Sequence, residues 1–251
     1  MPLQYLRRLT GTERTERANR HLARILAGVA GAVNAGGFFA VGQYTSHMSG
    51  IVAAMADNLA LGGLLLVLRG AGAVLSFISG AYVTTLMIRY SRQRSLKSTY
   101  SAPLVLEAGL LLVFALTGQA HLAGHALSWT AILLCFTMGV QNAMITKISG
   151  AVIRTTHLTG MITDIGISLG RVTYPGHGEE FTPANDEINR MQLHASLVLL
   201  FLAGGITGAL GFRHVGFLFT VPFAMVLFLL GALPIVDDVT DSRRSRRGAA
   251  S

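Results

Sequence analysis

Charged residues are scarce in this sequence, and their scarcity excludes an ordinary water-soluble domain. They make up 13% of the 251 residues, whereas soluble domains carry roughly 25%. The charges gather in residues 1–24, Arg89–Lys97 and Glu179–Arg190, and after Asp237. The stretches between these clusters are almost continuously apolar.

Several chemical signatures are also missing. The single cysteine, Cys135, excludes an intrachain disulfide. The chain contains no H-E-x-x-H, G-x-S-x-G or G-x-x-x-x-G-K-[ST] motif, so we expect neither enzymatic activity nor nucleotide hydrolysis. His121 and His125 have helical i, i+4 spacing but no third ligand near them in the sequence. We therefore expect no metal site and no cofactor.

Long apolar runs dominate what remains, and they predict membrane helices. A transmembrane helix needs about 20 mostly apolar residues, whereas the strands of a membrane barrel alternate apolar and polar residues over about 10. The apolar runs here are continuous and helix-sized. They predict an all-α integral membrane protein, a polytopic helical bundle whose surrounding partner is the lipid bilayer. The apolar segments lie at roughly 23–43, 50–68, 71–90, 103–119, 127–146, 156–171, 192–212 and 215–234.

The positive charge of the chain is explained by topology rather than by nucleic acid. The net charge is +8, but the basic residues lie in tails and loops beside apolar segments, as the positive-inside rule describes. We expect residues 1–22 to be a basic cytoplasmic N-terminus, residues 23–234 a single membrane domain and residues 235–251 a basic cytoplasmic tail. No nucleic-acid partner is expected.

Two halves of the membrane domain repeat each other. Thr45–Gly50 reads TSHMSG and Thr155–Gly160 reads TTHLTG. Upstream of these strings stand Asn34 and Asn142, at an offset of 108 (142 − 34 = 108). Repeat 1 covers about residues 23–90 and repeat 2 about residues 127–213.

The distribution of charge favours six crossings over eight. If all eight segments cross, the basic loops 89–97 and 147–154 fall outside, against the positive-inside rule. If segments 50–68 and 156–171 are broken or re-entrant, both loops lie inside, and only Arg69 and Arg213 remain on the wrong side. In this arrangement the repeats are inverted, as in many transporters. Segment 50–68 is nevertheless long enough to cross.

Small residues recur at four-residue spacing in two segments. Gly28, Ala32 and Gly36 share one face of the first segment, and Gly204 and Gly208 share a face of the seventh. Such stripes let membrane helices approach closely. We interpret them as packing surfaces.

The two repeated strings are the candidate solute site. Thr45, Ser46, Thr155 and Thr156 are good N-cap residues, and a helix starting inside the membrane directs free N–H groups at an anionic or polar solute. The alternative, ordinary polar turns at the membrane surface, stays open. The candidate substrate-binding residues are Thr45, Ser46, His47, Ser49, Gly50, Thr155, Thr156, His157, Thr159, Gly160, Asn34 and Asn142.

One carboxylate follows each string. Asp57 lies seven residues after Gly50, and Asp164 lies four after Gly160, so each falls on nearly the same face of its short helix. Carboxylates inside a membrane are costly and usually functional, so the two are candidate proton-coupling residues that work with the histidines of the strings. The alternative, two solvated interfacial carboxylates, stays open.

These same residues resemble the YoaK-like family of bacterial membrane proteins, also called domain of unknown function 1275. The resemblance rests on Asn34 with Gly37-Phe38, on Ser46–Gly50, and on Gly139–Ala143 followed by Thr155–Gly160, and it covers about residues 24–234. It implies a multi-pass protein of the bacterial inner membrane with about six helices. It implies no established activity.

Two classes of function follow from these observations. The first is a secondary transporter or channel for a small polar or anionic solute of unknown identity, with both termini cytoplasmic. The second is a non-transporting membrane scaffold or assembly protein. The sequence leaves open whether the chain forms a homo-oligomer.

Overall fold

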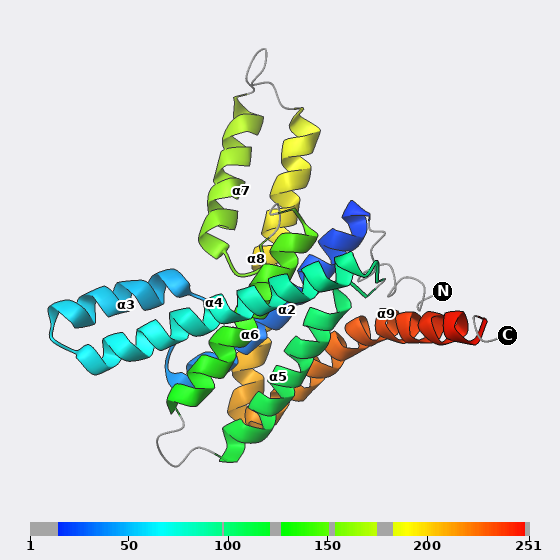
Figure 1. The fold of residues 1–251 in the computed structure, drawn as a ribbon. Helices are drawn as coiled ribbons and strands as arrows, with labels where there is room; N and C mark the ends of the chain where they lie inside the picture. The colour runs from blue at the N-terminus through cyan, green and yellow to red at the C-terminus, as the bar shows by residue number, and fades with distance from the viewer. Residues whose placement is uncertain (1–14, 97, 121–126, 151–153, 175–182, 249–251) are drawn as a thin grey trace.

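The computed structural model describes residues 15–96, 98–120, 127–150, 154–174 and 183–248. In these ranges the secondary structure is helical, which confirms the predicted all-α class (Figure 1). The elements are α2 (Glu16–Val41), α3 (Met48–Ala60), α4 (Leu64–Gln93), α5 (Ser101–Ala120), α6 (Leu127–Ile148), α7 (Leu158–Thr173), α8 (Ala184–Val215), the 3₁₀ helix η2 (Gly216–Thr220) and α9 (Val221–Gly248).

The first membrane helix begins before its apolar run. The hydroxyl of Thr15 accepts a hydrogen bond from the N–H of Ala18 and caps α2, and Leu22 is fully buried. The expected boundary at residues 22 and 23 therefore falls inside a helix. At its other end α2 stops at Gly42, which adopts a left-handed φ of 71°. Gly150 has a φ of 61° just beyond α6, at the equivalent position of the second half (150 − 42 = 108).

Three other boundaries differ from those expected from apolarity. Segment 50–68 is not continuous, because α3 ends at Ala60 and the chain turns at Gly62, whose φ of 77° favours glycine. Helix α8 begins at Ala184 rather than near residue 192, and α9 runs unbroken past residue 235. A polar sequence can continue a helix that has already been nucleated by its apolar part.

Six helices are long enough to cross a bilayer, and the short helices α3 and α7 are not among them. By length and composition the described residues hold five candidate spans, the last of which, Ala184–Val236, contains both α8 and the first part of α9. The remaining four lie in α2, α4, α5 and α6. This agrees with six crossing helices and two shorter segments.

Each half packs its helices against the other half. Helix α2 packs on α8, and α6 packs on α4, at equivalent glycines. A β-carbon at Gly204 would lie 2.0 Å from the carbonyl oxygen of Gly28, and one at Gly80 would lie 2.2 Å from that of Phe136. Residue 136 corresponds to residue 28, and residue 204 to residue 80, by the offsets of the repeat (136 − 28 = 108; 204 − 80 = 124). The predicted stripes of small residues thus pack on each other, and the repeat is visible as two equivalent interfaces.

Helix directions distinguish six crossings from eight. Leu26, early in α2, accepts a hydrogen bond from Gln141, late in α6, while Gly37, late in α2, lies against Leu134, early in α6. The two helices are therefore antiparallel. Successive crossings alternate in direction, so α6 opposes α2 if it is the fourth crossing and runs parallel to it if it is the fifth. The antiparallel packing fits six crossings and the inverted relation of the halves.

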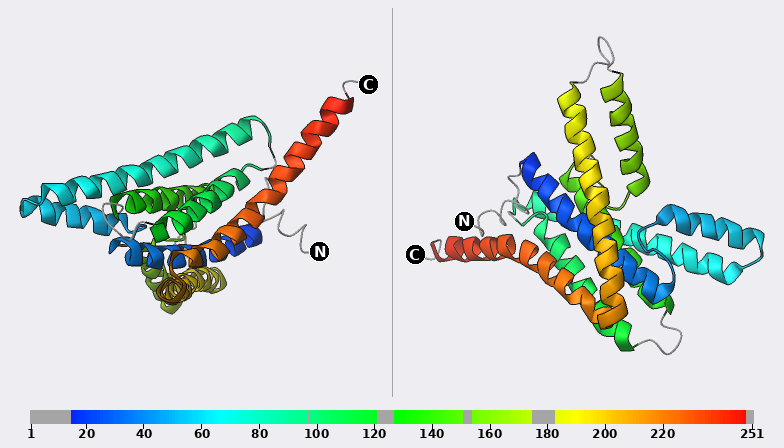
Figure 2. Two further views of the ribbon diagram at one scale, coloured as in Figure 1. Left: turned by 90° about the horizontal axis from the view of Figure 1, so that it is seen from below. Right: turned by 180° about the vertical axis from the view of Figure 1, so that it is seen from behind.

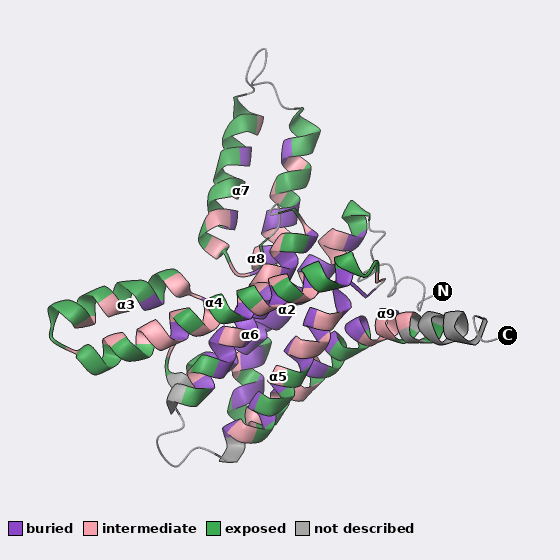
Figure 3. Cartoon of the chain, viewed as in Figure 1, coloured by how far each residue is buried: buried purple, intermediate pink, exposed green. Residues whose placement is uncertain are grey.

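Two hairpins project from the central bundle. Helices α3 and α4 form one, α7 and α8 the other, and they extend in different directions (Figures 1 and 2). Buried residues concentrate where α2, α6, α5 and α8 meet, whereas both hairpins are largely exposed (Figure 3). The two candidate strings lie where the chain leaves the bundle to enter these hairpins.

Candidate functional site at two helix breaks

Each candidate string is attached to the preceding helix by the same contact. Ser46 donates from its hydroxyl to Oδ1 of Asn34 over 3.1 Å, and Thr156 donates to Oδ1 of Asn142 over 2.5 Å. Asn34 is 3% exposed, and its Oδ1 also accepts the backbone N–H of Ser46. The structure thus brings the predicted amides and hydroxyls together within each half.

The threonine before each of these hydroxyls is buried and unpaired. Thr45 and Thr155 are 0% exposed, and the Oγ1 atom of each has no hydrogen-bond partner among the described residues. An unsatisfied buried hydroxyl costs about 1–3 kcal/mol. Both halves carry this cost at equivalent positions. The repetition suggests that the two breaks use the threonine hydroxyl in the same way.

The predicted capping role of these residues is wrong. His47 and His157 occupy the N-cap positions of α3 and α7, and neither side chain caps its helix. The hydroxyls are instead used by the preceding helix, because Asn34 and Asn142 offer buried acceptors. The first N–H groups of α3 and α7 therefore lack a capping side chain, and these helix ends keep their partial positive charge.

The two histidines differ. His47 is half-buried, with Nδ1 at 3.5 Å from Nδ2 of Asn34 and 3.4 Å from the hydroxyl of Ser46. The neutral ring of His47 can accept such a hydrogen bond at Nδ1. His157 is exposed and folds over Gly160, where a β-carbon would lie 2.2 Å from its Nδ1. Its Nδ1 also lies 3.5 Å from Nη1 of Arg154.

The first turns of α3 and α7 hold the remaining string residues. Ser49 and Gly50 are exposed in α3, while in α7 Thr159 is exposed and Gly160 is half-buried. Among the described residues, none of these four forms a hydrogen bond with the other half of the chain. They lie near the helix starts but do not themselves bridge the two breaks.

A cavity of about 580 Å³ opens beside the first break. Asn34, Tyr44 and His47 supply its polar groups, and the aromatic ring of Tyr44 stacks on Phe38 at a centroid distance of 5.0 Å. Leu158, the first residue of α7, lines the same cavity. The two breaks therefore meet at one cavity, but the second contributes an apolar side chain and not His157.

The predicted pairing of each carboxylate with its histidine is not observed. Ten residues of helix, about 15 Å, separate His47 from Asp57, which is exposed on α3. Asp164 is 52% exposed and its Oδ2 lies 4.0 Å from Nε2 of His194 on α8. A shared helix face does not bring two groups into contact when they are several turns apart.

A polar cluster lies between α7 and α8 that the sequence pattern did not predict. Glu187 is 1% exposed and accepts hydrogen bonds from Ser168 over 2.7 Å and from Arg171 over 3.1 Å. Glu187 lies in the charged stretch Glu179–Arg190, ahead of the apolar segment 192–212, so apolarity gave no reason to place it in a helix. Glu187 and His194 are seven residues apart and so share one helix face, and this spacing is the signal that could have revealed the polar cluster. His121 and His125 lie outside the described residues.

Comparison with known proteins places the chain in a family. The model of the family described as "Protein of unknown function (DUF1275)" matches residues 22–233. The chain is similar to UPF0700 transmembrane protein YoaK of Bacillus subtilis (strain 168), with 26% identity over 216 residues that cover 83% of this chain and 91% of that protein. No solved structure matches it. The match over most of its length shows that this chain is a transmembrane protein of the DUF1275 family, as its strings and asparagines had indicated.

Proposed function

We propose that this protein is a secondary transporter or channel in which the two helix breaks bind a small polar or anionic solute. The observation that carries the proposal is the equivalent pair of breaks, each with an asparagine–hydroxyl contact, a buried unpaired threonine and an uncapped helix start. Broken helices in opposed repeats are the usual plan of a secondary transporter site.

The arrangement of the connections supports movement around this site. Close backbone contacts make α2 with α8 one unit and α4 with α6 another. Because α3 packs on α4 and α7 packs on α8, each string passes from one unit to the other. A rocking motion of the two units would therefore be concentrated at the strings, where it would open or close access to the cavity.

The proposed setting is a bacterial inner membrane with both termini in the cytoplasm. This orientation puts Arg89, Arg92 and Arg94 at the end of α4 on the inside, as the positive-inside rule requires. The solute site then lies between the two membrane surfaces. Asp57 and Asp164 remain candidates for proton coupling, acting from the exposed faces of the hairpins rather than through His47 and His157.

The test combines a binding screen with a flux assay. The purified full-length protein is screened for thermal stabilisation by inorganic phosphate, sulfate, acetate, succinate, glycine and glycerol. Any stabilising compound is then followed as a radiolabelled solute into proteoliposomes. We expect at least one of the polar or anionic probes to raise the unfolding midpoint and to enter the vesicles.

Matched variants connect the signal to the breaks. Ser46→Ala and Thr156→Ala remove the hydroxyls bound to Asn34 and Asn142, whereas Ser79→Ala removes a hydroxyl bonded within its own helix. We expect the first two to reduce flux at least tenfold and Ser79→Ala to leave it unchanged. Equal flux in all three variants, or no stabilisation and no flux with any probe in folded protein, would favour the scaffold alternative.

A further inference from the structure

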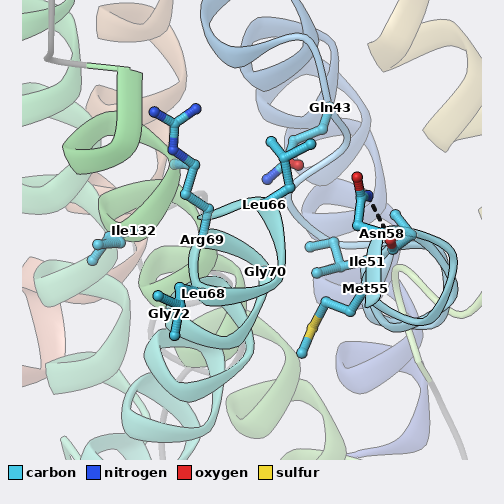
Figure 4. Close-up of a pocket in the computed structure, with 12 residues that line it drawn as sticks. Gln43, Ile51, Met55, Asn58, Leu66, Leu68, Arg69, Gly70, Gly72 and Ile132 are labelled. Carbon is cyan, nitrogen blue, oxygen red and sulfur yellow. Dashed lines mark hydrogen bonds between the residues drawn. The ribbon is translucent and has the colours of Figure 1, made fainter. Parts of the chain in front are cut away.

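A second pocket lies in the hairpin of α3 and α4, and its lining residues Gln43 and Ile51 flank the first string. Its volume is about 510 Å³, and the start of α6 closes one side with Ala131 and Ile132. Figure 4 shows Ile51 and Met55 of α3 directed toward α4, where Leu66 and Gly70 face them. The wall is mostly apolar, as expected for a groove that takes a hydrocarbon chain.

Arg69 is the charged residue among the described residues that line this pocket. Its side chain forms no hydrogen bond or ion pair with another described residue. The amides of Gln43 and Asn58 also line the pocket, and Asn58 donates one N–H to the carbonyl of Ala54, which leaves its second N–H available. The polar part of the pocket therefore offers one cation and two amide donors.

The position of Arg69 along α4 needs an explanation beyond topology. The residues from Gly70 to Ile88 are uncharged, and Arg89 follows. Twenty residues of helix span about 30 Å, the thickness of the hydrocarbon core, so the two arginines mark its two surfaces. With the end of α4 inside, Arg69 lies at the outer surface, where the positive-inside rule expects few cations.

The neighbours of Arg69 are lipid-facing. Leu61, Leu64, Leu65 and Leu68 are each at least 60% exposed in the isolated chain. An arginine in such surroundings extends its flexible side chain to the headgroup region, where it meets lipid phosphates. The positive charge of Arg69 therefore favours a lipid with a negatively charged headgroup as the ligand of the groove.

We propose that this groove binds an anionic phospholipid, with the phosphodiester on Arg69, Gln43 and Asn58 and an acyl chain against Ile51 and Met55. The net negative headgroup is required because the described residues that line the pocket supply a cation and no carboxylate. This site is distinct from the proposed transport site, because the two cavities share no lining residue, although Gln43 and Ile51 flank the first string.

Native mass spectrometry of the full-length protein in detergent tests the proposal. Dioleoyl phosphatidylglycerol and dioleoyl phosphatidylcholine are titrated separately and in competition. We expect phosphatidylglycerol to bind at least tenfold more tightly than phosphatidylcholine. Arg69→Gln should weaken the binding of phosphatidylglycerol about tenfold through loss of a charge-assisted hydrogen bond. Arg69→Lys should retain most of the affinity, and Arg89→Gln, on the same helix, should retain all of it.

A second variant blocks the groove without removing charge. A β-carbon at Gly72, which lines the pocket, would meet nothing within 4 Å, so Gly72→Leu fills the groove without disturbing the helix. Gly109 on α5 is equally open but lies outside the pocket, and Gly109→Leu is the control. We expect only Gly72→Leu to reduce lipid binding. Equal affinity for both lipids, unchanged binding in Arg69→Gln and Gly72→Leu, or displacement of the lipid by millimolar inorganic phosphate would overturn the proposal.

Discussion

The glycine contacts between the halves give the sharpest test of this fold. A β-carbon at Gly204 would lie 2.0 Å from the carbonyl oxygen of Gly28, and one at Gly139 would lie 2.1 Å from that of Phe77. Real β-carbons keep more than 3 Å from such atoms, so Gly204→Ala must separate α2 from α8 by about 1 Å. In a membrane bundle these interfaces are held by close van der Waals packing, which such a separation removes.

The expected loss of stability follows from overpacking. Inserting a methyl group into a packed interface costs about 1–3 kcal/mol. At Gly109, where a β-carbon meets nothing within 4 Å, the change to alanine should instead be neutral or stabilise the helix by up to about 1 kcal/mol. We therefore expect Gly204→Ala and Gly139→Ala to lower the thermal unfolding midpoint in detergent, and Gly109→Ala to leave it unchanged or raise it.

Combining the substitutions tests the assignment of interfaces. Gly31 and Gly204 both lie between α2 and α8, whereas Gly139 lies between α4 and α6. The effects of Gly204→Ala and Gly139→Ala should add, because the sites share no partner, while Gly31→Ala with Gly204→Ala should cost less than the two separate effects. If alanine at Gly204 and Gly139 is tolerated as well as at Gly109, the proposed pairing of helices is wrong.

Other predictions concern topology, coupling and the breaks. On a Cys135→Ala background, Leu61→Cys should react with a membrane-impermeant maleimide in intact cells and Arg94→Cys only after permeabilisation, because one complete crossing, α4, separates them in the inverted model. The reverse pattern contradicts that model. Asp57→Asn should change the free energy of unfolding by less than about 0.5 kcal/mol, since the side chain is exposed, yet abolish proton-coupled flux of any solute found by the screen. Flux that persists in this variant and in Asp164→Asn would remove both carboxylates from the coupling mechanism. Asn142→Ala should lower the free energy of unfolding by about 0.5–1.5 kcal/mol through loss of the Thr156 hydrogen bond, measurable by denaturant titration in detergent.

The sequence pointed to the residues at the two helix breaks but could not predict their contacts. The repeated strings and the two asparagines could be found because their polar residues interrupt apolar segments at nearly equal offsets, 110 for the strings (155 − 45) and 108 for the asparagines (142 − 34). That Ser46 and Thr156 would donate to asparagines rather than cap α3 and α7 depends on where α2 and α6 run beside the breaks. The partner of Asp164, His194, lies on another helix, and helical spacing within one segment cannot reveal it.

The sequence by itself determined the membrane class, the repeat and the stripes of small residues, because apolar length and four-residue spacing are properties of a local segment. It also indicated that segments 50–68 and 156–171 differ from the rest, through the placement of basic loops. The tertiary structure decided that α2 packs on α8 rather than on its own half, and that α2 and α6 are antiparallel. A glycine stripe indicates that a helix packs closely on another helix, but which helix that is depends on the packing of the whole bundle.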